Sequence, residues 1–198
     1  MEALLNPRLH GNGFIQYDLP NNHRLHIFHP ELVQYGQKVR TEIHTHMFDM
    51  RSHILYGELN HLHYKIVDGT MYNVYTCNYG MTVPPESTLT RSKLYPDTYG
   101  FKIISSANLI KGSSYFFRQG EWHSSSSNDL TVTLIQKRQL GFFHNQQSAM
   151  VACVDGLKPD NDYSRTSVPQ QIIKKYTSLA LDVIDHDKIS QIVHEQSS

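Results

Sequence analysis

Two histidines, His44 and His46, stand two residues apart in the segment EIHTHMFDM, which covers residues 42–50. In a β-strand, residues i and i+2 lie on the same face, so both imidazole rings would point the same way. Neutral imidazole is the commonest metal ligand in proteins. The chain has 13 histidines, however, and a second pair with the same spacing, His61 and His63. Spacing alone therefore does not identify a metal site.

The residues around the two pairs differ in character. Arg40 and Glu42 share the face of the first pair, and this polar face fits either a metal site or a solvent-exposed strand surface. Around the second pair, the alternate positions are more apolar, which predicts that these two histidines point outward. Those alternate positions are Asn60, Leu62, Tyr64 and Ile66.

The elements that would position these side chains are mostly strands. Short segments rich in β-branched and aromatic residues alternate with turn signals through the first three quarters of the chain. Asp68-Gly69 is a strong hairpin signal and Gly57-Glu58 a weaker one. Strands without intervening helices favour an antiparallel barrel or sandwich. The predicted strands cover 13–19, 25–29, 39–47, 51–56, 59–67, 71–78, 101–110, 113–118, 130–137 and 150–154.

Two parts of the chain depart from the strand pattern. Residues 82–100 contain three prolines and little periodicity, which predicts a long loop of the kind that often forms a lid or a binding segment. Near the end, apolar residues recur at helical spacing, and Asp187 is expected to cap a short second helix. We therefore expect a β-barrel domain over 1–155, and a linker with helices packed on the barrel over 156–198. The helical stripe consists of Ile172, Tyr176, Leu179 and Val183.

Composition limits the classes of partner. Lys plus Arg equals Asp plus Glu at 18 each, which gives no reason to expect a nucleic acid or another polyanion. No apolar run is long enough to span a membrane. Cys77 and Cys153 lie far apart and share no repeated spacing, and no signal peptide is recognisable. We therefore expect reduced thiols in a cytoplasmic protein.

A third histidine, His123, follows two glycines, Gly112 and Gly120, at a spacing that bears on the first histidine pair. The segment 112–123, GSSYFFRQGEWH, together with the pair, resembles the two motifs of the cupin family. The resemblance extends over about residues 13–155. Arg118 replaces a proline of the second motif, and Met50 stands where the first motif has a carboxylate. The matching residues are His44, His46, Gly57, Gly112, Gly120 and His123.

The resemblance implies a cupin-type antiparallel β-barrel, or jelly roll, that holds one divalent metal through His44, His46 and His123. Three neutral imidazoles leave the ion its full charge and open positions, which favours an anionic or chelating small-molecule ligand. A three-histidine centre without the carboxylate is similar to that of the cysteine-dioxygenase-like cupins, so Fe(II) is favoured, with Zn, Mn or Ni as alternatives. Asp49 would become a fourth ligand if the strand bulged after His46.

The function implied by this resemblance is that of a metal-dependent dioxygenase acting on a small molecule. A redox-neutral isomerase, lyase or hydrolase is one alternative, and a binding protein that sequesters a metabolite or signal is another. Cupins frequently dimerise, so a homodimer is expected. The segments RLHIFHP and IHTHMFDMRS are also similar to uncharacterised cupin-like proteins of bacteria and phages, a resemblance that transfers no activity.

Further residues would complete such a site. Arg40 or Arg51 would hold an acid group of the substrate, as an arginine does in the thiol dioxygenases, and Glu42 would serve as an acid–base group or orient a ligand. Each is equally compatible with an ordinary surface role. The residues expected to line the substrate pocket are His53, Trp122 and Arg118.

Overall fold

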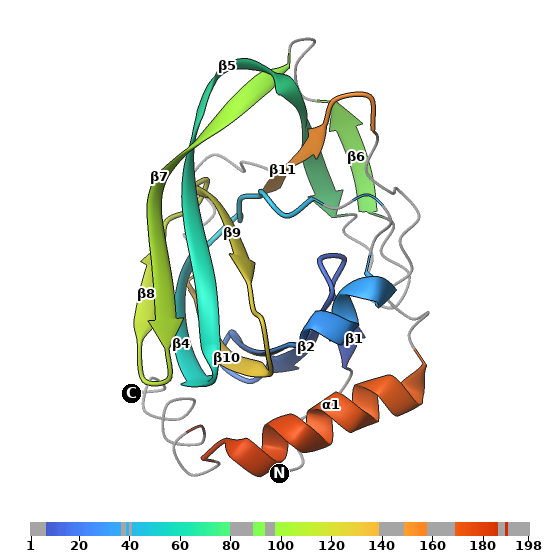
Figure 1. Cartoon of the computed structure of the whole chain (residues 1–198), viewed down its shortest axis with the longest axis vertical. Coiled ribbons are helices and arrows are strands. Elements are labelled where there is room, and N and C mark those ends of the chain that lie inside the picture. Colours follow the sequence, from blue (N-terminus) through green and yellow to red (C-terminus); the bar gives the residue numbers. More distant parts are fainter. Residues whose placement is uncertain are drawn as a thin grey trace.

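The computed structural model describes residues 7–36, 39, 41–79, 89–93, 98–138, 149–157, 169–185 and 189. Its strands form two antiparallel sheets, sheet A and sheet B, and helix α1 (Gln170–Val183) lies outside them (Figure 1). The prediction of an all-β fold with a C-terminal helix is confirmed. Among the described helices, none has the length and apolar character needed to cross a membrane.

Sheet A has six strands in the order β1-β2-β3-β10-β4-β8. The turn between β2 and β3 places Asn21 and Asn22 at positive φ, a conformation that asparagine tolerates better than most residues. β10 enters between β3 and β4, although it comes much later in the chain, so the sheet forms from distant segments. The strands are β1 (Arg8–Leu9), β2 (Phe14–Leu19), β3 (His23–Phe28), β4 (Asp49–Tyr56), β8 (Ser114–Phe117) and β10 (Thr131–Arg138).

Sheet B is organised around the long strand β5. The first part of β5 pairs with β7 and β9, and the second part pairs with β11 and β6. β6 falls within the segment 82–100 that the sequence predicts to be a loop. The strands are β5 (Glu58–Tyr79), β6 (Leu89–Lys93), β7 (Tyr99–Ile110), β9 (Trp122–Ser126) and β11 (Ala149–Val154).

Both predicted hairpins are wrong. β5 continues through Asp68-Gly69 as one strand of 22 residues, because each half has its own partners and the halves do not pair with each other. Gly69 instead allows a close approach, since a Cβ there would lie 2.6 Å from the nitrogen of Gly100. Gly57, with φ of +76°, turns the chain from β4 in sheet A to β5 in sheet B.

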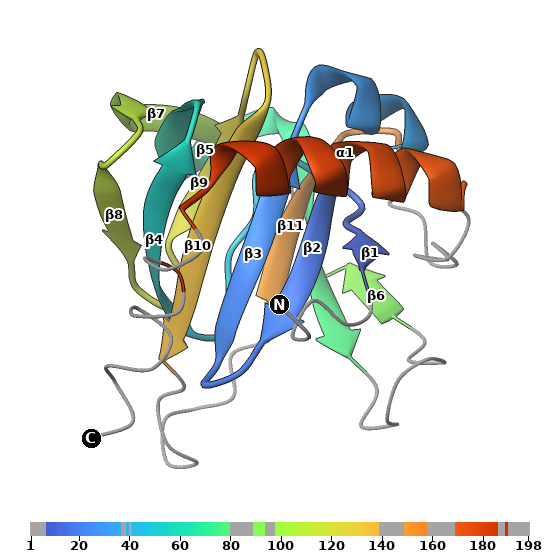
Figure 2. The same cartoon turned by 90° about the horizontal axis from the view of Figure 1, so that it is seen from below.

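One face of sheet A carries the largest apolar cluster of the described residues. Strands β2, β3 and β10 contribute alternate side chains, and helix α1 covers them (Figure 2). We call this cluster the outer core, because it lies between the sheet and the helix. Its buried members are Leu9, Ile15, Tyr17, Leu25, Ile27, Leu32, Val132, Ile173, Tyr176, Ala180 and Ile184.

Helix α1 confirms the predicted helix but turns a shifted face toward the sheet. Leu179, which the predicted stripe places inside, is 41% exposed, whereas Tyr176 is fully buried. The Tyr176 hydroxyl donates a hydrogen bond to the carboxylate of Glu31 in the short 3-10 helix η1 (Pro30–Tyr35). The second helix, predicted to begin at Asp187, lies almost entirely outside the described residues.

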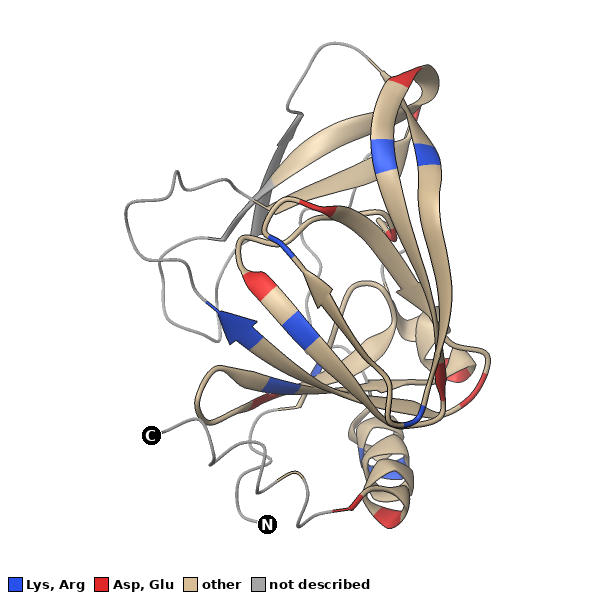
Figure 3. Cartoon of the chain, turned by 90° about the vertical axis from the view of Figure 1, so that its left-hand side faces the viewer, with Lys and Arg blue, Asp and Glu red and all other residues tan. Residues whose placement is uncertain are grey.

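The opposite face of sheet A, the inner face, is turned toward sheet B and is more polar. Gln16, His26 and Thr133 are all buried on it. Phe117 of β8 stacks on His123 of β9, with ring centroids 4.1 Å apart, so the two sheets meet here. Charged residues, in contrast, are scattered along both sheets (Figure 3).

Candidate metal centre

The histidine pair that opened the sequence analysis lies on an extended segment between β9 and β11. The predicted strand over 39–47 is not formed, and His44 makes only isolated bridges, to His123 and to Val151. The backbone N–H of His44 donates to the carbonyl of His123 at 3.0 Å, and the N–H of His123 donates back to His44 at 3.0 Å. Thr45 N–H donates to the Met150 carbonyl at 2.8 Å. The backbone of the segment is thus fixed on both sides.

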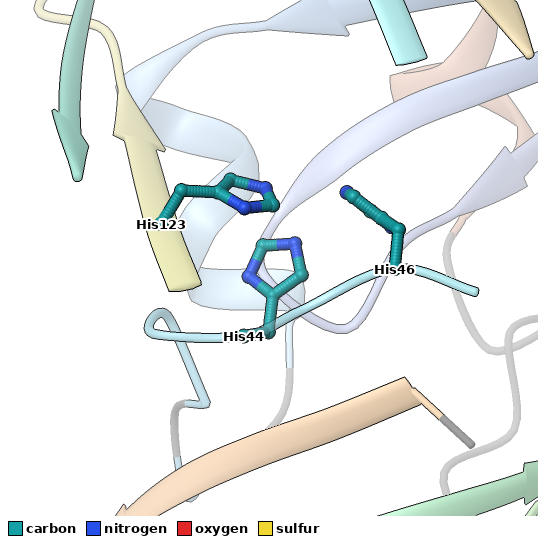
Figure 4. Close-up of side chains that lie close together, drawn as sticks. All are labelled: His44, His46 and His123. Carbon is teal, nitrogen blue, oxygen red and sulfur yellow. The ribbon is translucent and has the colours of Figure 1, made fainter. Parts of the chain in front are cut away.

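This pairing brings three imidazoles together. One ring nitrogen from each of His44, His46 and His123 lies within 4.8 Å of the others. Figure 4 shows the three rings converging from the extended segment and from β9. His123 is buried, and the other two are half-buried. The three residues that the cupin resemblance named therefore form one cluster.

Backbone carbonyls orient two of the three rings. Nδ1 of His44 donates to the Glu42 carbonyl at 2.7 Å, and Nδ1 of His123 donates to the Glu121 carbonyl at 3.1 Å. A nitrogen that donates to a carbonyl carries the ring proton, so Nε2 keeps the lone pair. Metal-ligating histidines commonly have their second ring nitrogen held in this way. His46 is positioned by packing instead, since its ring stacks on Phe48 at 5.1 Å.

The surroundings keep all three rings neutral near pH 7. Burial lowers the pKa of His44, an effect that the hydrogen bond to the Glu42 carbonyl partly offsets. Burial, followed by the nearby His44, Arg24 and His26, holds the pKa of His46 well below its usual value. Burial and the other two rings of the cluster hold the pKa of His123 well below its usual value. Three neutral imidazoles fit a divalent ion such as Fe(II) or Zn(II).

The position of the missing carboxylate is filled by packing. Met50 is buried with Phe117 and Ile135 on the inner face. Asp49 lies outside the histidine cluster, and its carboxylate accepts a hydrogen bond from the backbone N–H of Gln119 at 2.9 Å. The alternative in which Asp49 serves as a fourth ligand finds no support in this arrangement.

The residues predicted to act on a substrate are not gathered around the cluster. Glu42 is exposed, and its contribution to the site is the carbonyl that holds His44. Arg51 is exposed on β4, where it alternates with the buried Met50. Arg40 lies outside the described residues.

The three predicted pocket residues also lie elsewhere. His53 alternates on β4 with buried Ser52 and Ile54, so its side chain belongs to the other face of sheet A. Trp122 precedes His123 on β9 and packs on the opposite face, where its ring lies 4.8 Å from that of Phe101.

Arg118 is exposed, and its described contact is made by its backbone. The N–H of Arg118 donates to the carboxylate of Glu121 at 2.9 Å. This bond helps to close the turn before β9, so the position of Arg118 supports the turn rather than a pocket wall.

The second histidine pair contradicts its prediction. His61 is buried, its ring lies 5.9 Å from that of His123, and its Nδ1 hydrogen-bonds with the Ser125 hydroxyl at 3.0 Å. The ring of His63, two residues further on, lies 4.8 Å from that of Phe117 and is tilted against it. The prediction failed because other residues pack on both faces of β5. The apolar residues at alternate positions, such as Tyr64 and Ile66, therefore do not mark the face that is turned toward the histidine cluster.

His26 is a further buried histidine near the cluster. Its ring lies 4.6 Å from that of Phe14, and it is one of the neighbours that lower the pKa of His46. Alternation along β3 could have placed it, because Leu25 and Ile27 on either side are apolar and enter the outer core.

The chain is similar in structure to several solved proteins. The Drosophila melanogaster CENP-C cupin domain is 9% identical, over 64% of this chain and 71% of that chain, with a TM-score of 0.35. The hydroquinone 1,2-dioxygenase PnpCD, solved with Cd2+ and 4-hydroxybenzonitrile, is 13% identical over 63% and 61%, with a TM-score of 0.31. Streptomyces albus HEPD, solved with 2-hydroxyethylphosphonate and Fe(II), is 8% identical over 91% and 26%, with a TM-score of 0.31.

A cupin domain, of the family that the sequence motifs resemble, is thus among these proteins of similar structure. No family model matches the chain, and no curated protein is similar to it in sequence.

Proposed function

We propose that the chain is a metal-dependent enzyme acting on a small molecule, with a single Fe(II) ion bound by His44, His46 and His123. The observation that carries this proposal is the cluster itself, in which two rings have their Nδ1 held by carbonyls. Histidines that bind a metal commonly have their second ring nitrogen held in this way. The reaction class that we favour is that of a dioxygenase.

The charge balance of the cluster supports this choice. Three neutral imidazoles, with no carboxylate from the described residues among them, leave a divalent ion its full charge. Such an ion would supply Lewis acidity, and Fe(II) would in addition supply electrons for dioxygen chemistry. The chain's own part is to bind the ion, orient the rings and keep water away. Phe48 and Phe117, stacked on His46 and His123, provide the apolar surface for this last task.

Elemental analysis of the purified protein tests the first half of the proposal. The wild type, reconstituted anaerobically with Fe(II), is expected to hold about one ion per chain. The variant His44→Ala/His46→Ala is expected to lose it, while His53→Ala, on the other face of sheet A, retains it. Equal metal content in all three proteins would overturn the proposal.

Oxygen consumption tests the second half. The Fe(II)-loaded protein is expected to take up oxygen with at least one member of a panel of small thiols and diketones. Activity that survives without oxygen and with Zn(II) would favour a redox-neutral isomerase, lyase or hydrolase instead. Metal binding without turnover of any kind would contradict the enzymatic proposal.

A second candidate function is a non-catalytic binding protein. The observation in its favour is that Glu42 and Arg51, two of the residues predicted to act on a substrate, are exposed. A small molecule that remains bound to the purified, metal-free protein would favour this candidate.

A further inference from the structure

Lys137 is a cationic side chain on the inner face of sheet A. It follows Thr133 and Ile135 at alternate positions of β10, and both of those side chains are buried. Ile135 packs with Met50 and Phe117, next to the histidine cluster. Lys137 thus extends the inner face toward the end of the strand.

A single phenyl ring separates Lys137 from a candidate metal ligand. The Lys137 ammonium lies 5.8 Å from the centre of the Phe48 ring, and Phe48 stacks on His46 at 5.1 Å. The Arg24 guanidinium lies 5.9 Å from the centre of the same ring. Two cationic groups therefore lie around Phe48, beside the three-histidine cluster.

Lys137 and Arg24 differ in their ionic contacts. Arg24 binds the carboxylate of Asp18, with its Nε 2.9 Å from Oδ1, and Arg8 binds the same carboxylate. Lys137 has no carboxylate partner among the described residues. Burial, together with the positive charges of Arg24 and Arg8, lowers the pKa of Lys137 from 10.5 to about 8.

A half-buried ammonium without a counter-ion is unfavourable for folding, because burial removes water and neighbouring cations repel it. A cation–π contact with Phe48 offsets only part of this cost, since both groups lie near the 6 Å limit of that interaction. Charged groups kept in such surroundings are candidates for a functional site. An anionic ligand would supply the missing partner.

We propose that Lys137, with Arg24 beside it, binds the acid group of a small-molecule substrate whose reacting end lies at the three-histidine centre. The substrate class is therefore a compact molecule with a phosphate, phosphonate or carboxylate group at one end. The part of this proposal that concerns the reacting end rests on the proposed metal site. The part that concerns the acid group does not.

Titration of the metal-free protein tests the anion site directly. Inorganic phosphate and acetate serve as probes, and isothermal titration calorimetry at pH 7 measures the affinity for each. The probe that binds more tightly identifies the kind of acid group. Lys137→Met is expected to weaken binding of the preferred probe about tenfold, as for loss of one charge-assisted hydrogen bond. Lys137→Arg, which keeps the charge, is expected to retain most of it.

The matched control is Lys102→Met, because Lys102 is exposed on β7. This variant is expected to bind the probes as the wild type does. Equal weakening in Lys102→Met and Lys137→Met, or no binding to the wild type, would overturn the anion site. Thermal unfolding of each variant verifies that it is folded, and removal of a desolvated charge is not expected to destabilise the Lys137→Met protein.

A second measurement tests the link to the metal centre. In protein loaded with Co(II), the 31P relaxation of bound phosphate is expected to be enhanced relative to the Zn(II)-loaded protein. Unchanged relaxation would overturn the link while leaving the anion site in place. A wild-type protein that binds neither Co(II) nor Zn(II) would instead contradict the proposed function. Failure of the link and failure of the proposed function are therefore distinguishable.

Discussion

The two faces of sheet A are built from the same strands but serve different purposes. On β3, Leu25 and Ile27 enter the outer core, whereas the alternate residue His26 is buried on the inner face. The outer face is apolar and closed by helix α1, while the inner face carries the imidazole of His26, several hydroxyls and a lysine. Strand alternation thus lets stability and chemistry occupy adjacent residues. Changes on one face should leave the other largely unaffected.

The largest expected effect is a loss of metal affinity on replacement of His123. This residue belongs to sheet B and lies where sheet B meets the inner face of sheet A. His123→Ala is expected to lower the affinity for a divalent ion roughly 1000-fold, because a whole ligand is lost. Competition with a chelator of known affinity measures this. His53→Ala, on the other face of sheet A, serves as the control. Comparable losses in both variants would contradict the separation of the faces.

The next effect is on stability, from the outer core. Ile27→Ala is expected to lower the free energy of unfolding by about 3 kcal/mol, because Ile27 is fully buried beneath the helix. Urea denaturation measures this change. The folded fraction of the variant should still bind the metal with wild-type affinity, and a parallel loss of affinity would show that the two faces are coupled.

A smaller effect shows whether Asp49 binds the metal or only holds the backbone at Gln119. Asp49→Asn keeps an oxygen that can accept the Gln119 N–H, so metal affinity is expected to stay within about threefold of the wild type. Asp49→Ala removes the acceptor and is expected to cost about 1 kcal/mol of stability. If Asp49→Asn reduced metal affinity as strongly as His123→Ala, the carboxylate would have to be counted as a ligand.

The smallest effect is the pH dependence of stability due to Lys137. Burial and the nearby arginines lower its pKa to about 8 in the folded chain, whereas the unfolded value is 10.5. Between these pH values the unfolded chain binds more protons, so the folded state gains stability as pH rises. Below pH 8 the charged Lys137 lowers the free energy of unfolding by its full amount, which solvent screening limits to under about 1 kcal/mol.

Lys137→Met should therefore be more stable than the wild type at pH 7. The difference should shrink between pH 8 and 10.5, which urea denaturation across this range would measure. A difference that stays constant across the range would mean that Lys137 titrates normally in the folded chain.

The sequence predicted the three histidines but not the way they are brought together. The spacing of Gly112, Gly120 and His123 was informative because a turn and the strand after it determine where a ligand emerges. The segment around His44 was predicted as a strand, yet its bonds are made to β9 and β11, which local pattern does not reveal. Long-range pairing was the missing information.

Elsewhere the prediction failed where both faces of a strand are at least partly buried. The apolar residues at alternate positions of β5 do not face a single core, so His61 was assigned to the wrong side. The hairpin at Asp68-Gly69 failed for a related reason, since turn residues also occur where a long strand bends and changes partners. Lys137 gave no signal at all, because only its three-dimensional neighbours distinguish it from other lysines.

The mutual backbone hydrogen bonds between His44 and His123 have a consequence for folding kinetics. These two residues lie far apart in the chain, and contacts of this kind close large loops and form slowly. The cluster can assemble only after β9 and β11 have both reached the extended segment. Metal uptake during refolding should therefore follow the slowest folding phase, which makes the optical spectrum of bound Co(II) a reporter of complete folding rather than of early collapse.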